Sequence, residues 1–466
     1  MKKNSVSLHL LLALFIVLFS SKTVPGEVLR QNDVERSVRT SFPPLLAALQ
    51  EIRQADGEAL SAKGWFDTTL RGKADNNSLG YYENRAYDVS LEQPLSWGGA
   101  NLFGGWRLGE GTFPIYDGKL DTRSLGESRV GARLPLLRDR AIDSRRAELG
   151  KTVLGQDSAK LSVEQQRLAI MSNAIQRYWL WVAAGHRLRI GRNVLDIAKN
   201  RQALLDKAAD SGQIPAIDAI DNRRAILQRQ SQVVEAERGL QGAALDLSLL
   251  YRDAQGNPII PAESELPDEI KPADDTVGPD TNTAIARALQ ERPDALRIAA
   301  QRAAAEIDLK AARNAKLPGL DLTSTFTSES GTGIVKRGPQ EFRAGITFEL
   351  PFQRRVAEGR IQASQAKVTQ LVQRERYARD SIREEVQDAL SALQTAFERV
   401  RLTQEELLVT RQLEQAERIK FDFGEGTLFL LNLREQATLE SAVRSITALS
   451  DHQRAFAALR YATGDL

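Results

Sequence analysis

Two short stretches carry polar side chains at the same spacing, "GQIPAIDAID" at residues 212–221 and "GTLFLLNLRE" at residues 426–435. Each has a glycine, an Asp or Asn six residues later, and an acidic residue nine residues later. Paired carboxylates can act as general acid and base in a hydrolase. The plainer interpretation of Asp218 and Asp221 is a solvated helix start, where carboxylates are favoured.

The sequence offers few residues for other catalytic or metal-binding chemistry. The chain has no Cys, which excludes disulfides, thiolate metal sites, Cys nucleophiles and a lipid anchor on an N-terminal Cys. Its three His residues, at 9, 186 and 452, are too sparse for the usual zinc or His-based catalytic patterns. No phosphate-cradling motif and no convincing triad is present. We therefore expect no catalytic, cofactor or metal site, and predict that the protein is not an enzyme.

The charge balance also limits the partners. A formal net charge of +2 gives no large basic field, so nucleic acid is not expected as a partner. At the N-terminus, two Lys residues precede the apolar run "LHLLLALFIVLF" (8–19). This layout predicts a secretory signal peptide over residues 1–26, with an N-terminal anchor helix as the alternative. No other stretch approaches the ~20 apolar residues of a spanning helix.

The two polar stretches belong to a larger internal repeat. "SRVGARLPLL" (128–137) aligns with "FRAGITFELP" (342–351), and the offset of 214 residues equals that between Gly212 and Gly426. Each copy begins with a Pro-marked, Ala-rich starter helix. The repeat predicts a tandem duplication, with a first copy at 27–253, a connector rich in Pro, Asp and Gly at 254–283, and a second copy at 284–466.

Long helices dominate each predicted copy. Residues 139–208 contain no proline, and apolar residues recur at the alternating three-and-four spacing of a coiled-coil seam. A helix of about 70 residues is on the order of 100 Å long, more than a globular core usually accommodates. Each copy therefore reads as a helical hairpin. The tips lie near 212 and 426, where glycine permits a sharp turn.

In the segments before the long helices, apolar and polar residues alternate instead. Residues 64–137 and 320–352 read as β-hairpins, and ten aromatic residues lie between 65 and 116. Unpaired strand edges are not stable in a membrane, so several chains would have to close them into a barrel, with the aromatics as an interfacial belt. The alternative is a small soluble sheet. Residues 76–127 exceed one hairpin loop, and predict either a long extracellular loop or extra strand-like structure.

Taken together, the chain resembles the TolC-type outer-membrane efflux proteins over residues 30–466. The resemblance rests on the duplicated element order, on "ERPDAL" (291–296), on the junctions "LPLLRDRAIDSRRAEL" and "LPFQRRVAEGRIQASQAK", and on the glycine tips. It implies a mixed α and β membrane protein that forms a homotrimer. About four strands per chain would close a β-barrel in outer-membrane lipid, continued by a long α-helical barrel through the periplasm.

The resemblance also implies a function and sites. Such channels passively conduct substrates from an inner-membrane transporter, and dock onto a periplasmic adaptor through their tips, here Gly212, Gln213, Gly426 and Thr427. The family's pore constriction falls by register on Asn432 and Glu435, with Asp218 and Asp221 as counterparts in the first copy. Three chains would then supply carboxylate rings that hold cations.

The sequence departs from the family at the predicted constriction. Leu428 and Phe423 occupy the positions of the family's gate arginine and tyrosine, and Asn432 replaces an acidic residue. Two alternatives to a channel stay open at this point. An exported coiled-coil structural or adhesive protein would explain the heptads but not the paired β-segments. A periplasmic hydrolase would need polar residues clustered on loops, whereas the acidic residues here are spread along helices.

Overall fold

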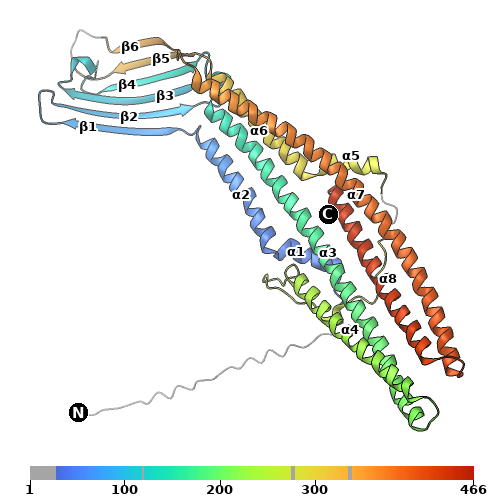
Figure 1. Ribbon diagram of the computed structural model, residues 1–466. Coiled ribbons are helices and arrows are strands. Elements are labelled where there is room, and N and C mark those ends of the chain that lie inside the picture. Colours follow the sequence, from blue (N-terminus) through green and yellow to red (C-terminus); the bar gives the residue numbers. More distant parts are fainter. Residues whose placement is uncertain (1–27, 118–119, 274–278, 334–337) are drawn as a thin grey trace, which may run out of the picture.

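The computed structural model describes residues 28–117, 120–273, 279–333 and 338–466. The signal peptide predicted for residues 1–26 lies outside these ranges. A sheet occupies one end of an elongated molecule, and a bundle of long helices extends from it to two hairpin tips at the opposite end (Figure 1). None of the helices in the described ranges is long and apolar enough to cross a membrane.

The two halves of the chain have the same order of elements. Two short helices, then strands, then two long helices occur in each half. The short helices are α1 (Gln31–Ser41) and α2 (Pro43–Gly64) in the first half, and α5 (Thr281–Glu291) and α6 (Pro293–Ala315) in the second. Pro43 and Pro293 both stand in the first turn, where a missing N–H costs no helical hydrogen bond.

The longest helices run from the sheet to the tips. They are α3 (Ser144–Asp210), with 67 residues, and α7 (Arg355–Asp422), with 68 residues. Each turns back into a shorter helix, α4 (Ala216–Ser248) after α3 and α8 (Leu428–Thr463) after α7. Asp143 caps α3 by accepting a hydrogen bond from the Arg146 backbone N–H at 2.9 Å.

The main core lies midway along the helices. Trp181, Met171 and Ile175 of α3 are buried there, together with residues of α1, α4 and α8. The predicted connector (254–283), which contains the short 3-10 helix η2 (Glu263–Glu265), covers this core. Leu266 packs on α3 at Gly185, where an added Cβ would lie 2.1 Å from the Leu266 side chain. The described part of the connector therefore straps the two helical hairpins together.

The six strands within the described residues form one antiparallel sheet in the order β1-β2-β3-β4-β5-β6. The first half contributes β1 (Thr69–Asn77), β2 (Asn84–Pro94), β3 (Asn101–Gly111) and β4 (Glu127–Pro135), with the 3-10 helix η1 (Ile115–Asp117) between β3 and β4. The second half contributes β5 (Gly319–Glu329) and β6 (Gln340–Glu349). The β4–β5 pair joins the two halves.

The prediction of about four strands per chain is wrong. Residues 64–137 contain four strands rather than one hairpin, and the segment whose role was left open, 76–127, supplies β2 and β3. Glycine accounts for the error. Gly104, Gly105, Gly109 and Gly111 all lie in β3, and a residue without a side chain adds nothing to an alternating hydrophobic pattern.

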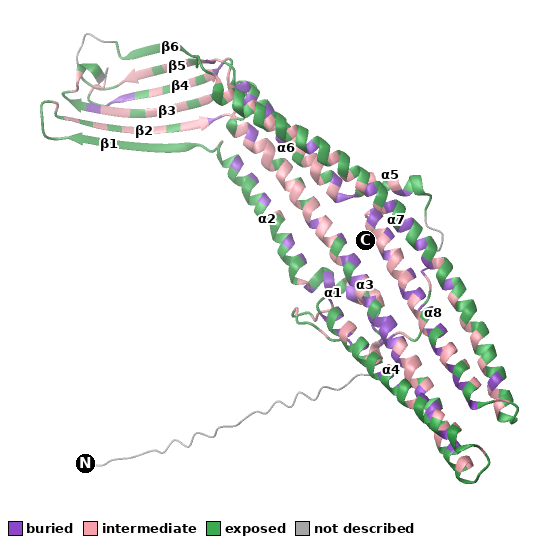
Figure 2. Cartoon of the chain, in the orientation of Figure 1, coloured by how far each residue is buried: buried purple, intermediate pink, exposed green. Residues whose placement is uncertain are grey.

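The sheet has one apolar and one polar face. Strand register aligns the apolar side chains, as in the pairs Leu70 with Leu91, Val130 with Phe326, and Phe326 with Phe342. The other face carries charged residues joined across strands, including the ion pair of Arg133 with Asp321. Figure 2 shows that both outermost strands, β1 and β6, are largely exposed. An apolar outer face and a polar inner face are the pattern of a barrel wall in a membrane.

Candidate functional site

The first tip is a five-residue turn between α3 and α4. Gly212 adopts a φ of 72°, a left-handed conformation that glycine reaches without strain. The backbone N–H of Gln213 donates to the Ala208 carbonyl at 2.9 Å, which closes the end of α3. Both Gly212 and Gln213 are exposed. The structure thus places these two predicted docking residues on the surface of the tip.

At the second tip the turn glycine is Gly424, not Gly426. Gly424 has a φ of 77°, whereas Gly426 does not adopt a positive φ. Gly426 is needed for a different reason, because an added Cβ would lie 2.9 Å from the Phe421 backbone nitrogen. Thr427 is the N-cap of α8, and its hydroxyl accepts a hydrogen bond from the Leu430 N–H at 3.3 Å.

The tips therefore align with a different offset from the one predicted. In both hairpins the left-handed glycine stands two residues after the long helix and four residues before the next one, so Gly212 matches Gly424. The offset of 214 still relates the ends of β4 and β6. At the tips the offset is 212 residues, because the junction between β6 and α7 is shorter than the junction between β4 and α3. Asp218 and Asp221 are consequently not the positional counterparts of Asn432 and Glu435.

A small apolar cluster joins the two tips. It consists of Leu205 on α3, Ala219 on α4 and Leu428 on α8. Leu428, which the sequence register assigned to the gate arginine, is only 3% exposed. Phe423, which the register assigned to the gate tyrosine, is 80% exposed. The apolar contact therefore holds the tips together at a place where a polar gate was the family expectation.

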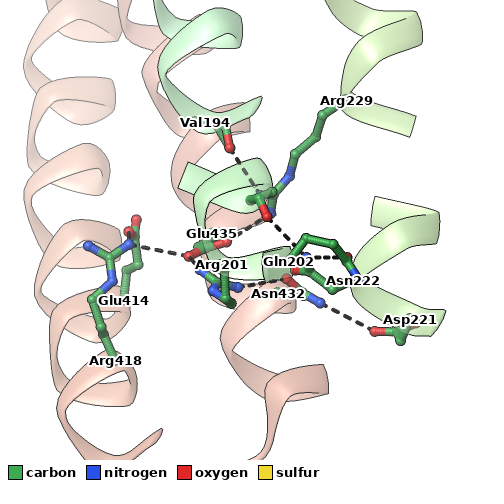
Figure 3. Close-up of polar contacts among 11 residues, drawn as sticks. Val194, Arg201, Gln202, Asp221, Asn222, Arg229, Glu414, Arg418, Asn432 and Glu435 are labelled. Carbon is green, nitrogen blue, oxygen red and sulfur yellow. Dashed lines mark hydrogen bonds and ion pairs between the residues drawn. The ribbon is translucent and has the colours of Figure 1, made fainter. Parts of the chain in front are cut away.

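Immediately behind this cluster, Glu435 lies at the junction of four helices. Its side chain on α8 is 2% exposed, and one carboxylate oxygen accepts hydrogen bonds from Arg201 of α3 and, at 3.2 Å, from Arg418 of α7. The other oxygen accepts a hydrogen bond from Arg229 of α4 at 2.9 Å. Figure 3 shows the three guanidinium groups converging on this carboxylate. One acidic side chain therefore connects the two helical hairpins.

The ionisation of Glu435 follows from these contacts. Burial by itself raises the pKa of the Glu435 carboxyl, because it removes water from the charged form. The positive charges and hydrogen bonds of Arg201 and Arg229 outweigh burial, and the pKa lies below its ordinary value of 4.5. Glu435 is therefore a carboxylate at neutral pH, and its charge is neutralised within the chain.

Asn432 and Asp221 extend this network towards α4. Asn432 accepts a hydrogen bond from Arg201 at 3.1 Å and donates one to the Asp221 carboxylate at 3.3 Å. Asp221 also pairs with Arg224, one turn along α4, at 3.0 Å. Asp218 lies in the first turn of α4 and is partly exposed. The structure thus brings Asp221, Asn432 and Glu435 together and leaves Asp218 outside their contacts.

The three arginines were not among the residues predicted from the sequence. Arg229 had a recognisable signal, because it stands between Ala225 and Val233 in the buried stripe of α4 and is itself 3% exposed. A charged residue at such a position needs a buried partner. Arg201 and Arg418 had no comparable signal, since arginines are frequent on the exposed faces of the long helices. Together the three residues make this site a structural clasp between hairpins, defined here as Glu435 with Arg201, Arg229 and Arg418.

Comparison with known proteins gives one family match. Residues 284–465 match the family model described as outer membrane efflux protein. No curated protein is significantly similar in sequence to the chain.

Solved structures match over nearly the whole chain. The outer membrane protein VceC from Vibrio cholerae superposes with a TM-score of 0.67 at 14% identity, covering 93% of this chain and 96% of that one. The CmeC outer membrane channel of Campylobacter jejuni gives 0.64 at 17% identity, with coverages of 93% and 85%. The open state of the MtrE outer membrane channel of Neisseria gonorrhoeae gives 0.62 at 15% identity, with coverages of 93% and 88%.

These findings agree with the geometry. A rod of paired helices ends in a sheet with one apolar face, and the same arrangement recurs in outer-membrane channels that share few identical residues with this chain. The resemblance predicted from the sequence is confirmed. Residues 284–465 are thus similar to the outer membrane efflux protein family, and the whole chain has the fold of the TolC-type outer-membrane channels.

Proposed function

We propose that the protein is the outer-membrane channel of a tripartite efflux or type I secretion system. Three copies form the channel, and it conducts substrates passively from an inner-membrane pump and a periplasmic adaptor to the outside. The observation that carries this proposal is the sheet. Its apolar face suits lipid, its charged face suits an aqueous lumen, and its two outer strands are each paired with one neighbour only within the described chain.

The helical part supports the same proposal. At 1.5 Å per residue, α3 and α7 each extend about 100 Å, a length that suits a conduit across the periplasm. Because conduction down such a tunnel is passive, the proposal requires no nucleotide or catalytic site in this chain. The pump supplies the energy.

At the periplasmic end, we assign Asp218, Asp221, Asn432 and Glu435 to the constriction, with two different roles. Asp218 and Asp221 are partly exposed at the start of α4, where six carboxylates from three copies attract cations. Glu435 and Asn432 are buried and hold the hairpins in place. The clasp then determines how far the mouth opens, and the Asp residues influence which ions pass.

Conductance in planar lipid bilayers tests the channel. Purified protein should migrate as a trimer and produce discrete current steps. Recovery in the soluble periplasmic fraction, or a trimer that never conducts, would refute the channel and favour an exported coiled-coil or adhesive protein. Asp218→Asn combined with Asp221→Asn should lower cation preference. Asp246→Asn, far from the tip on the same helix, should leave it unchanged.

Adaptor docking requires its own test. Gly212, Gln213, Gly426 and Thr427 surround the two tips, and Gln213 is exposed without being the N-cap or the turn glycine. A photo-crosslinking amino acid at Gln213 should capture the periplasmic adaptor in cells. The same amino acid at Gln241, an exposed position farther along α4, should not. Equal capture at both positions would contradict docking through the tips.

A further inference from the structure

We propose that the outer-membrane barrel of this protein has eighteen strands, six from each of three copies, with β1 of one copy paired to β6 of the next. This inference rests on the proposed trimer. The partner at each sheet edge is a second copy of the chain. The strand number follows from β2 and β3, the hairpin that the sequence left unassigned.

The β2–β3 hairpin is an integral part of the sheet. All residues of β2 are in register with β3, from Asn84 opposite Gly111 to Pro94 opposite Asn101, and seven residues of β3 are in register with β4. Gly105 permits the close approach of β2, since an added Cβ would lie 2.5 Å from the Val89 carbonyl oxygen.

A side-chain bridge ties β4 to β2 across β3. Arg129 of β4 lies opposite Gly105, and its guanidinium donates to both carboxylate oxygens of Asp88 on β2, at 2.6 and 2.7 Å. Gly105 presents no side chain on this face, which leaves the path clear. The neighbouring pair of Arg107 and Glu127, at 2.9 Å, links β3 to β4 on the same face. These contacts hold the hairpin in the plane of the sheet, which is inconsistent with a plug or a free loop.

Both faces of the sheet continue through the added hairpin. On β2 the exposed side chains alternate and are mostly apolar, with Tyr87, Val89 and Leu91 on the outer face. On β3, Leu102 and Trp106 occupy the same face. The inner face of β2 carries Asp88, Ser90 and Glu92 instead. A strand that meets lipid on one face and water on the other belongs to the barrel wall.

The free edges are compatible with closure by copies of the chain. β1 leads away from α2 and β6 leads back into α7, so an edge-to-edge pair between copies is antiparallel. Placing Ala74 of β1 opposite Ala344 of β6 keeps Leu70 and Phe348 on the outer face. A sheet edge in lipid leaves backbone groups without hydrogen-bond partners, so the edges must meet.

The perimeter of the helical part fits six strands. Four helices, α2, α3, α6 and α7, adjoin the sheet in each copy (Figure 1). At about 9–10 Å between axes they span roughly 38 Å of circumference. Six strands, about 4.8 Å apart and tilted about 40°, also span roughly 38 Å. Eighteen strands give a wall about 36 Å across, in the size range of porins with aqueous channels.

Disulfide formation tests both the pairing of β1 with β6 between copies and, through the β1–β4 variant, the strand number, because the natural chain has no Cys to interfere. Ala74→Cys should be combined in turn with Phe342→Cys, Ala344→Cys and Ile346→Cys, to allow for the stagger between copies. At least one pair should give covalent trimers on a denaturing gel. Ala74→Cys with Ala132→Cys, on β1 and β4, should give no disulfide, because two strands separate these positions.

A twelve-strand barrel predicts the opposite result for the last variant. With β2 and β3 outside the wall, β1 and β4 would be neighbours, and Ala74→Cys with Ala132→Cys would form an intramolecular disulfide. That disulfide, or a cryo-EM map of the unsubstituted trimer with twelve strands, would overturn the inference and leave the proposed channel intact. A protein that is not trimeric in detergent would overturn both the strand number and the proposed channel. The mass of the purified protein therefore shows whether the inference alone has failed or the proposed function as well. Eighteen strands in the map would establish the inference without any substitution.

Discussion

Replacing Glu435 by Gln should release the clasp and loosen the tips. The substitution keeps the size of the side chain but removes the negative charge that Arg201 and Arg229 share. Arg229 is 3% exposed, so its guanidinium would be left buried without a counter-ion. Removing one partner of a buried ion pair typically costs about 3–5 kcal/mol. Because the clasp lies beside the tips, we expect this cost to appear as local opening there.

Hydrogen exchange and conductance measure the two consequences. Amides near Arg201 and Asn432 should exchange faster in the variant by two or more orders of magnitude, since about 1.4 kcal/mol corresponds to about tenfold. Amides in the core around Trp181 should be unaffected. In planar bilayers the proposed channel should spend more time in its high-conductance state in the variant than in the unsubstituted protein.

Glu414→Gln is a matched control, because it makes the same change of charge at a carboxylate outside the buried network. Glu414 also contacts Arg418, at 2.7 Å, but this is an i, i+4 pair within α7, in which Glu414 is 16% and Arg418 40% exposed. Glu414→Gln should cost no more than about 0.5 kcal/mol. A double-mutant cycle of Arg229→Gln and Glu435→Gln should show a coupling of about 0.5–3 kcal/mol. Equal exchange rates in the Glu435 and Glu414 variants would refute the clasp.

Three further predictions concern pH, the turn and the sheet. Because the pKa of Glu435 is lowered in the folded protein, the stability that Glu435 contributes is complete above the ordinary value of 4.5 and is lost as the pH falls through the folded-state pKa. Hydrogen exchange of the tip amides should therefore accelerate in that acidic window. Glu435→Gln should abolish this pH dependence. Gly424→Ala should destabilise the second tip by about 1–2 kcal/mol through its left-handed backbone, and Gly426→Ala should perturb it through the close contact with α7, both measurable by hydrogen exchange. Phe326→Lys on the apolar face should lower barrel stability by about 2–4 kcal/mol in heat-modifiability gels, whereas Thr325→Lys on the polar face should change it little.

The sequence predicted the long helices well, because their signal is repeated over many turns. Residues 139–208 lack proline and carry apolar side chains at helical spacing, and α3 spans nearly the same range. Turns give a weaker signal. The second tip has two glycines, Gly424 and Gly426. Only Gly424 adopts the left-handed conformation of the turn, and the residue type alone does not tell the two apart.

The burial of Glu435 also could not be predicted from the sequence, but the reason differs from that for the turns. A carboxylate on a helix is exposed by default, and only the tertiary arrangement of α3, α4 and α7 brings three arginines to it. The β2–β3 hairpin was missed because four glycines interrupt the alternation of β3. In both cases the missing information concerned contacts between elements that lie far apart in the sequence.

The β4–β5 pair has a consequence for how the molecule is made. Glu127 lies opposite Glu329, so the sheet brings together strands from the two halves of the polypeptide. Neither half can complete its sheet until the other is available, and such long-range pairing is slow to form. Throughout this interval strand edges stay open to association with any other chain. Folding of the sheet therefore competes with aggregation, and its outcome should depend steeply on protein concentration.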